Sequence, residues 1–598
     1  MASKIQLRRD TAQNWSNNNP TLAAGEPGFE TDTGLFKIGD GSNNWNSLSY
    51  SGGGERPNGA IAVGHQAGQN CQSCQAVAIG YRAGRYCQSS GTVAIGEYAA
   101  EYNQGYHSIA IGSCAANGCC SHQQWDAIAI GRGAGYCNQG HETVAIGHQA
   151  GYHCQTNHAV AIGRHAGKYC QRYASVAIGN SAGACNQCCK SVAIGNFAGQ
   201  CSQSCESVAI GSFAGQYCQN SGSIAIGYRA AEYSQSNHAI AIGYCAANGC
   251  CGNQSSDAVA IGRSAGYANQ CFGAVAVGHI AGQHNQGTHS VAVGYGAARY
   301  CQAPHSVAIG VVAGKNCQSE YSVAIGYEAG RCCQGNGPFM SGGAVAIGYY
   351  AGYNNQEYHA IAIGRDAGTC CQGFSAVAIG RSAGNCSQGH GAVAIGKVAG
   401  YYDQGTNAVA IGNYSGRCSQ GNQAVAIGYY SGYNCQKSNA IAIGAYAAEV
   451  YQTYYIVQHS SGDGADSTIT LTNAYDFSSI RPGMLLTNNG YNDMLILAIN
   501  GQVLTLAGTP NNGSVTPGQT FNVVAQQGVN SIAIGSYAAN KTQFPNSIVI
   551  NATGSDLPSA GSGTTVIQSL RQVSGSVPSG FKQVYWNPTS GELIVVTP

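Results

Sequence analysis

The sequence predicts an all-β protein: a homotrimeric fibre whose shaft is a parallel β-solenoid (β-roll) of 16-residue coils, with small β modules at its ends. The tetrapeptide Val/Ile-Ala-Ile/Val-Gly recurs 25 times, and 24 copies follow one another between residues 61 and 444, nearly always 16 residues apart. Of the 598 residues, 87 are glycine and only 9% are charged, against about a quarter in ordinary soluble domains. Periodicity and composition favour a repetitive structure; the number three comes from a resemblance given below.

Each repeat is too short, and too often interrupted by glycine, for a pair of helices. It is typical of a short strand, a turn at the motif glycine, a second extended piece and a return turn. Stacked coils advance by ~4.8 Å each, so 24 of them form a rod roughly 115 Å long. Steps of 19 residues (112–131 and 243–262) and of 22 residues (326–348) place the extra residues at only two points of the unit, which we predict to be loops.

Side chains alternate along the strand, so Val and Ile of the motif lie on one face and Ala on the other. We expect Val and Ile to fill the coil and Ala to point outward. An outward face would normally carry polar residues, whereas Ala occupies this position in all 25 copies. The sequence therefore predicts a self-association seam along Ala62, Ala78, Ala94 and Ala110. The alternative is a slim monomeric solenoid whose alanine stripe has no role in association.

A glutamine stands eight residues before the next motif glycine in successive units. Stacked side-chain amides can hydrogen-bond to one another along the axis and satisfy buried polar groups without charge. We predict a structural ladder formed by Gln72, Gln88, Gln104, Gln139, Gln155 and Gln171.

All 28 cysteines lie inside the repeat array, and twelve of them stand seven residues after a motif glycine. Cysteines at this position in neighbouring coils should be stacked, but their parallel side chains are poorly placed for disulfides. We expect mostly free thiols, with some axial or interchain bridges as the alternative. Zinc-finger spacing is absent, so no metal or cofactor is predicted. The stacked thiols are Cys71, Cys87, Cys154, Cys170, Cys301, Cys317 and Cys333.

The charge balance argues against several functions. Lys and Arg number 26, and Asp and Glu 25, for a net charge of +1. Such a chain lacks the electrostatic attraction to phosphates that nucleic-acid binding requires. No apolar run approaches the ~18 residues of a membrane span, so we expect no membrane insertion. The first residues lack the apolar core of a secretory signal.

These patterns divide the chain into six parts. They are a β module at 1–50, a Gly-rich linker at 51–59, the shaft at 60–452, an inserted β domain at 453–529 with strands expected at 467–472, 494–499 and 502–507, a last repeat at 530–545, and a C-terminal β module at 546–598 that ends in a hairpin around 587–591.

The N-terminal part carries three motifs in order: Leu-Arg-Arg-Asp-Thr, Gly-Glu-x-Gly-x-Glu-Thr-Asp-Thr-Gly and Phe-Lys-Ile-Gly-Asp-Gly. It resembles the N-terminal module of phage tail fibres and of the major tropism determinant family, which is trimeric and belongs to the virion. The repeats are similar to the head repeats of trimeric autotransporter adhesins, although the 16-residue form with Ala-Gly and Gln is more typical of phage and giant-virus fibres. The resemblance implies three parallel chains; spacing alone indicates association without a number.

The resulting hypothesis is a virion tail fibre, extracellular when functional, that attaches to the host by multivalent binding without catalysis. Its partners would be itself, baseplate or tail proteins through the N-terminal module, and a host-surface glycan or protein. The alternatives are a cellular trimeric surface adhesin, a polysaccharide depolymerase and a purely structural filament. The sequence leaves open the receptor, the host, the end that faces the host, the cysteine redox state, and whether a C-terminal chaperone is removed.

Overall fold

The computed structural model describes residues 7–48, 50–51, 58–118, 123–249, 254–336, 342–449, 457–461, 468–471, 485–488, 491–500, 503–507, 520–524, 527–539, 543, 545–551, 565–568, 583–587 and 592–596. The chain forms two compact units, residues 1–332 and 333–598. The predicted loops at the long steps fall largely on residues 119–122, 250–253 and 337–341, outside the described residues.

The first unit begins with a small mixed module. Its sheet has the order β1-β2-β3-β4, in which β1 and β2 are parallel and the other pairs antiparallel. Its core contains Trp15 and Trp45, whose rings stack 4.1 Å apart. The elements are β1 (Arg8–Asp10), α1 (Ala12–Asn18), β2 (Pro27–Glu30), β3 (Phe36–Ile38), the 3-10 turn η1 (Trp45–Ser47) and β4 (Tyr50–Ser51).

Helix α1 was not predicted from the sequence, although a signal for it exists. The Thr11 hydroxyl accepts a hydrogen bond from the backbone N–H of Asn14 at 3.3 Å, which is an N-cap. The helix places Trp15 in the core, where its indole nitrogen donates to the Phe29 carbonyl at 2.9 Å. The module is thus a sheet covered by one short helix.

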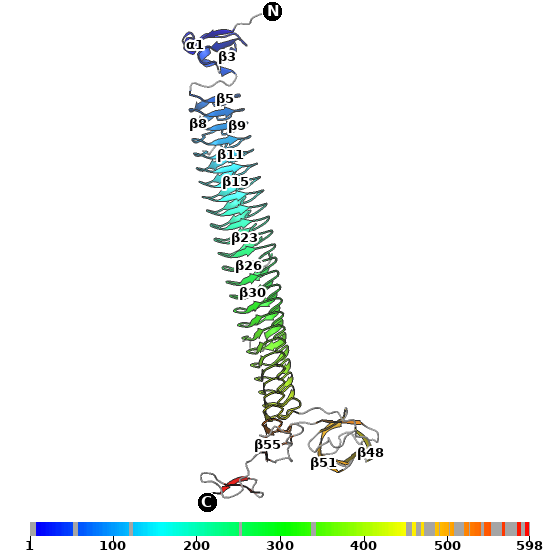
Figure 1. Ribbon diagram of the computed structural model, residues 1–598. Helices are drawn as coiled ribbons and strands as arrows, with labels where there is room; N and C mark the ends of the chain where they lie inside the picture. Colours follow the sequence, from blue (N-terminus) through cyan, green and yellow to red (C-terminus); the bar gives the residue numbers. More distant parts are fainter. Residues whose placement is uncertain are drawn as a thin grey trace, which may run out of the picture. The chain divides into compact units, whose positions relative to one another are not determined.

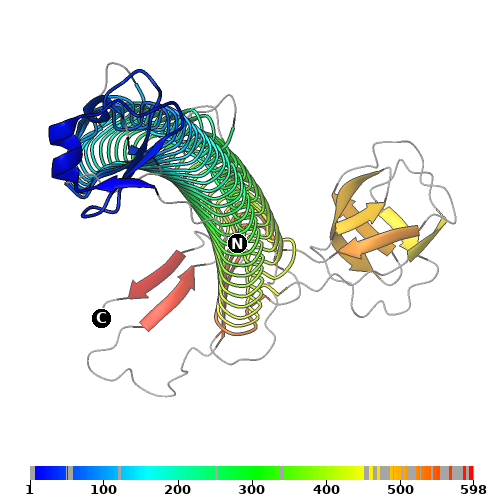
Figure 2. The same cartoon turned by 90° about the horizontal axis from the view of Figure 1, so that it is seen from above.

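The rest of the first unit is a stack of coils, most of them with two short strands (Figures 1 and 2). The motif strands form a parallel, in-register ladder: Val176 pairs with Val192 and Ala177 with Ala193. This ladder comprises β5 (Ile61–Val63), β7 (Val77–Ile79), β9 (Val93–Ile95), β10 (Ile109–Ile111), β11 (Ile128–Ile130), β13 (Val144–Ile146), β15 (Val160–Ile162), β17 (Val176–Ile178), β19 (Val192–Ile194), β21 (Val208–Ile210), β23 (Ile224–Ile226), β25 (Ile240–Ile242), β26 (Val259–Ile261), β28 (Val275–Val277), β30 (Val291–Val293), β32 (Val307–Ile309) and β34 (Val323–Ile325).

The second strand of each coil ends at the repeated glutamine and also pairs in parallel with its neighbours. Where a long step intervenes, single bridges such as Gln104 to Gln123 keep the register. These strands are β6 (Asn70–Gln72), β8 (Tyr86–Gln88), β12 (Cys137–Gln139), β14 (His153–Gln155), β16 (Tyr169–Gln171), β18 (Cys185–Gln187), β20 (Cys201–Gln203), β22 (Cys218–Gln219), β24 (Ser234–Gln235), β27 (Ala268–Gln270), β29 (His284–Gln286), β31 (Tyr300–Gln302) and β33 (Asn316–Gln318). Strand β35 (Cys332–Asn336) includes the boundary between the units.

The second unit contains coils of the same design. Its motif ladder comprises β36 (Val345–Ile347), β38 (Ile361–Ile363), β40 (Val377–Ile379), β42 (Val393–Ile395), β44 (Val409–Ile411), β46 (Val425–Ile427), β47 (Ile441–Ile443), β54 (Ile532–Ile534), β55 (Ile548–Asn551) and β56 (Thr565–Gln568). Its second ladder comprises β37 (Asn354–Glu357), β39 (Cys370–Gln372), β41 (Cys386–Gln388), β43 (Tyr402–Gln404) and β45 (Cys418–Gln420). The parallel β-solenoid predicted from the repeat is confirmed.

The inserted segment interrupts the sequence of this stack without interrupting its hydrogen bonding, because β47 pairs directly with β54. Six antiparallel strands of the insert close into a barrel in the order β48-β49-β52-β51-β50-β53. The ladder then continues to β55 and β56, beyond the last predicted repeat, and β57 pairs with β58 as a hairpin. The strands are β48 (Val457–Ser461), β49 (Thr468–Leu471), β50 (Leu485–Asn488), β51 (Tyr491–Asn500), β52 (Val503–Ala507), β53 (Thr520–Val524), β57 (Gln583–Asn587) and β58 (Glu592–Val596).

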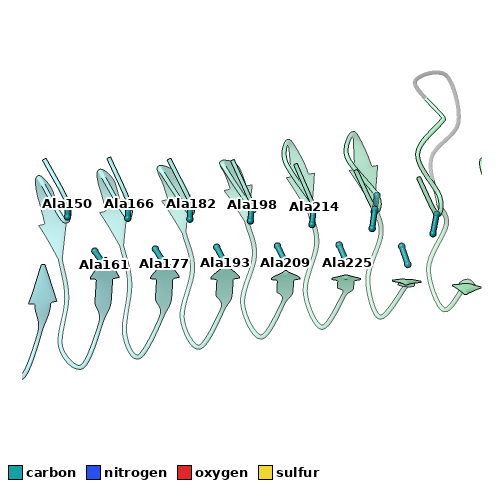
Figure 3. Close-up of a cluster of buried hydrophobic side chains, with 14 of the residues drawn as sticks. Ala150, Ala161, Ala166, Ala177, Ala182, Ala193, Ala198, Ala209, Ala214 and Ala225 are labelled. Carbon is teal, nitrogen blue, oxygen red and sulfur yellow. The ribbon is translucent and has the colours of Figure 1, made fainter. Parts of the chain in front are cut away.

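The interior of the coil is lined by alanine, which reverses the predicted strand orientation. Ala78, Ala94 and Ala110 have no exposed surface in the single chain, and Ala62 packs against the same core. The predicted seam along these four residues is therefore wrong. Along the repeats, the close approach of the opposite sides of the coil leaves room for little more than the methyl groups of alanine. Beyond the last repeat, Val549 of β55 takes the alanine position and is fully buried. Figure 3 shows the strand alanines facing those of the turn in successive coils, such as Ala161 and Ala166.

The motif glycine is required by two constraints at once. At Gly163 φ is +127°, and a Cβ there would lie 2.5 Å from the carbonyl oxygen of Gly179 in the next coil. A side chain would thus both strain the backbone and separate the rungs. The fourth residue after it, Gly167, has φ +51°, and its Cβ would lie 2.6 Å from Oε1 of Gln171. The two glycine positions of the repeat allow the coils to stack closely.

The alanine interior predicts that a larger side chain there destabilises the protein. Ala193→Leu should lower the free energy of unfolding by about 1–3 kcal/mol or more, because the opposing strands cannot move apart without breaking both ladders. Chemical denaturation with circular dichroism measures this. The control Asn180→Leu places the same side chain on an exposed turn and should change the stability by less than about 0.5 kcal/mol. Equal losses in both variants would refute the packing argument.

Candidate binding surfaces

The outer face of the motif ladder carries Val and Ile side chains on every rung. They are partly exposed in the single chain: Ile79 by 37% and Ile309 by 38% in the first unit, and Ile443 by 37% in the second. In-register stacking turns them into columns, which we call the Val/Ile stripe. Isolated exposed apolar residues are ordinary, but a continuous apolar patch usually indicates an interaction surface.

The repeated glutamine occupies the opposite strand and points inward. The amide nitrogen of Gln171 donates to the Val160 carbonyl at 2.7 Å, across the coil, and to Oε1 of Gln187 in the next coil at 3.1 Å. Every glutamine of the predicted ladder is buried and donates to the motif strand in this way. The geometry supports a structural role, because these amides bind the two strands and successive coils together.

The seven stacked cysteines named in the sequence analysis have a left-handed backbone, with φ between 49° at Cys87 and 57° at Cys71. Their side chains face outward; six of the seven named in the sequence analysis are exposed and Cys333 is half-buried. Burial, followed by the thiol of Cys71 in the neighbouring coil, raises the pKa of Cys87. No disulfide joins cysteines within the described ranges.

The cysteines one position earlier form similar pairs. Cys370 pairs in register with Cys386. Burial, followed by the Cys370 thiol, raises the pKa of Cys386 to about 11. Because the thiolate is the reactive form, Cys386 is a poor nucleophile at neutral pH.

A polar hollow of about 420 Å³ opens on the outside of the second unit, over β37, β39 and β41. In the next two coils, the position of Glu357 is occupied by Gly373 and Gly389, and the hollow lies beside these glycines. The Glu357 carboxylate crosses this gap to accept from the Phe374 N–H at 2.9 Å and lies 3.5 Å from His390 Nδ1. The rings of Phe374 and His390 lie 4.5 Å apart beside it. The hollow offers a carboxylate, an imidazole and ring edges to a small polar group.

Among the described residues, no cluster of three or more His, Cys, Asp or Glu side chains is placed to hold a metal ion. The longest α-helix found there is the seven-residue α1, so none is able to cross a membrane. The inserted barrel contains Asp493 in β51, whereas Asp463, Asp466 and Asp476, the other acidic residues of the insert, lie outside the described residues.

Comparison with known proteins identifies the N-terminal module. The family model of the major tropism determinant N-terminal domain matches residues 5–43, the part that holds β1, α1, β2 and β3. The resemblance predicted from the three N-terminal motifs is confirmed.

A hyaluronoglucosaminidase of Streptococcus pyogenes phage H4489A is 45% identical to this chain over 47 residues. The matched stretch is 8% of this chain and 13% of that enzyme. No solved structure matches the chain.

The glutamine column predicts a large cost for removing one amide. Gln187→Leu should destabilise the protein by about 1–3 kcal/mol, because the Val176 carbonyl and the amides of the adjacent rungs lose a buried partner. Thermal unfolding followed by circular dichroism measures the loss. Gln423→Leu, on an exposed turn, is the control and should be nearly neutral. A neutral Gln187→Leu would contradict the assigned role.

The raised thiol pKa predicts slow alkylation. In the folded protein Cys386 should react with iodoacetamide far more slowly at about pH 8 than in the unfolded chain, and its rate should rise until about pH 11. Since the folded pKa exceeds the unfolded one, this group costs no stability below pH ~9 and lowers it as the pH rises from about 9 to about 11. Peptide mass spectrometry measures the labelling; equal rates in folded and unfolded protein at about pH 8 would refute it.

Proposed function

We propose that this protein is a homotrimeric fibre of a phage particle that attaches the particle to its host by multivalent, non-catalytic binding. The N-terminal module, matched by a phage tropism-determinant domain over residues 5–43, would bind baseplate or tail proteins. The stacked coils would act as a stiff spacer. The distal third, with its barrel and hairpin, would meet a glycan or protein on the host surface.

The Val/Ile stripe is the observation that supports association. Val and Ile are partly or fully exposed on rung after rung, although either position could carry a polar residue without disturbing the alanine interior. Burying such a stripe against sister chains contributes roughly 25 cal/mol per Å² of apolar area. Because every coil adds the same contact, the association strengthens with the number of coils. The resemblance to trimeric fibres supplies the number three.

Avidity supports attachment by weak contacts. Three chains in parallel present three copies of any outer surface, such as the polar hollow beside Glu357. When one copy binds, the others bind from a high effective concentration. A modest affinity for a small surface group is then sufficient to hold a particle.

The assembly is tested by its mass. Light scattering should give three times 61.3 kDa for the full chain. Replacing Ile178, Ile194 and Ile210 by Glu places carboxylates on three neighbouring rungs of the stripe and should produce monomers, because desolvating a charge at such a contact is costly. Replacing the exposed Glu97, Glu142 and Glu206 by Gln is the control and should leave the mass unchanged. A monomeric wild-type chain would overturn the trimer.

Attachment is tested separately with labelled full-length protein and the bacteria that carry the source phage. The trimer should bind cells, and the Glu variants should lose most of the retained signal through loss of avidity. A wild-type trimer that binds no cells would exclude attachment and leave a purely structural role.

A second candidate function is polysaccharide cleavage, which the match to a phage hyaluronoglucosaminidase favours. Incubation of the full chain with hyaluronan and a reducing-end assay decides between the two. Release of reducing ends that scales with protein concentration would establish catalysis, and no release would leave binding as the proposed function.

A further inference from the structure

One outer face of the first unit concentrates positive charge on three consecutive coils. It is formed by side chains at the first, second and fifth positions after the motif glycines Gly131, Gly147 and Gly163. Because the coils are in register, equal positions form columns. The first column contains Arg132, His148 and Arg164, the second Gly133, Gln149 and His165, and the third Tyr136, Tyr152 and Lys168.

The cationic side chains of this face form one cluster, which we call the basic face: Arg132, His148, Arg164, His165 and Lys168. Nη2 of Arg132 lies 2.6 Å from Nε2 of His148, and the rings of His148 and His165 are 5.3 Å apart. Both arginines are exposed and the other three residues are half-buried. Five groups that carry or can acquire a positive charge thus lie together on a protein with a net charge of +1.

Elsewhere in the shaft, clustered cations lie next to a carboxylate. Arg82 and Arg85 both lie within 3.7 Å of the buried Glu101, and Arg229 lies 3.6 Å from Glu232. No ion pair with a carboxylate is found for Arg132, Arg164 or Lys168 anywhere in the part of the chain that the structure describes. The basic face therefore stacks like charges without internal compensation.

The two histidines respond to this field. Burial, followed by the charges of Arg132, Arg164 and Lys168, lowers the pKa of His148. Burial, followed by Lys168, Arg164 and His148, lowers the pKa of His165. The groups that act most strongly on both rings are all cations. Both histidines therefore take up a proton only at a lower pH than an isolated imidazole does, and an approaching anion would favour this protonation.

We propose that the basic face is a binding site for an acidic polysaccharide, whose carboxylate or sulfate groups lie along the column Arg132, His148 and Arg164. Arginine forks hydrogen-bond such groups in a bidentate manner. The rungs repeat every ~4.8 Å along one line, which suits a polymer with regularly spaced anionic groups lying parallel to the axis.

The neighbouring residues favour a sugar polymer over a nucleic acid. The rings of Tyr136 and Tyr152 stack 4.8 Å apart beside the cations, and both side chains are partly exposed. Aromatic surface with hydroxyl groups suits the mixed polar and apolar faces of sugars. A nucleic acid needs a wider basic surface, because its affinity depends on many phosphate contacts.

The biological meaning of this site rests on the proposed function, since an acidic glycan would be one class of host receptor. The binding itself does not. A purified chain that binds the polymer but not cells would support the basic face and refute attachment. A chain that binds cells but neither acidic polymer would refute the basic face and support attachment.

The test measures binding of the full chain to immobilised heparin and hyaluronan, with dextran as the neutral control, at about pH 7.5 and about pH 5.5. Wild type should bind at least one acidic polymer and not dextran, and the affinity should rise at the lower pH. The triple variant R132Q/R164Q/K168Q should weaken binding by about tenfold or more. The variant H148Q/H165Q should keep the neutral-pH affinity and lose most of the increase in acid.

The matched control R9Q/R263Q/K437Q removes the same charge from three separate places in the chain and should change the affinity by less than about twofold. Circular dichroism melting confirms that each variant is folded. Equal weakening by both triple variants would show that binding depends on net charge alone, and it would overturn the site. So would the absence of binding to either acidic polymer, or tighter binding to double-stranded DNA of matched charge.

Discussion

The width of the coil is the constraint on which the rest of the structure depends. In the repeats, the motif strand and the turn that follows it lie so close together that their alanines, such as Ala161 and Ala166, fill the interior with methyl groups. Val and Ile of the motif are consequently displaced to the outside. Polar groups inside the coil reach a backbone carbonyl, as Gln171 does across to Val160 and as the Ser415 hydroxyl does to Ala426 at 2.6 Å. The coil therefore has a fully packed interior that contributes little apolar burial per residue. Hydrogen bonding along both ladders, and association with other chains through the outer Val and Ile, are the natural compensation.

Periodicity made the fold predictable, because a strict 16-residue spacing permits few arrangements other than stacked rungs. An inserted β domain could also be expected, since the segments around Thr468–Leu471 and Val503–Ala507 differ so clearly in composition from the repeats, but its closure into a barrel was not predicted. Alternation alone could not decide which face of Val-Ala-Ile points inward. The rule that large apolar residues fill the core holds for domains with a wide interior. It fails for Ala177, because the space inside the coil is set by backbone stacking rather than by side-chain volume.

Other features could not be predicted by reading the sequence from one residue to the next. Helix α1 has a cap at Thr11 but no long apolar periodicity. The continuation of the ladder to β56 follows a segment with a different motif. The basic face combines Arg132, Arg164 and Lys168, residues that are ordinary in their own repeats and form a cluster only when consecutive coils are superimposed. In a solenoid, a functional surface is therefore found by reading down the columns of the repeat rather than along the chain.

The glutamine column has a direction. Wherever one amide of the column bonds to the next among the described residues, it donates toward the coil that follows it in sequence, as Gln155 does to Gln171 and Gln171 to Gln187. The column is divided into runs of this kind, because the side-chain oxygens of six members have no donor, namely Gln72, Gln88, Gln123, Gln302, Gln356 and Gln527. The aligned amide dipoles add along the axis, as peptide dipoles do in a helix. The two faces of any coil are thus chemically distinct, one presenting amide hydrogens and the other amide oxygens. A new rung can only be added in one sense, so head-to-head joining of two stacks would set like dipoles against each other.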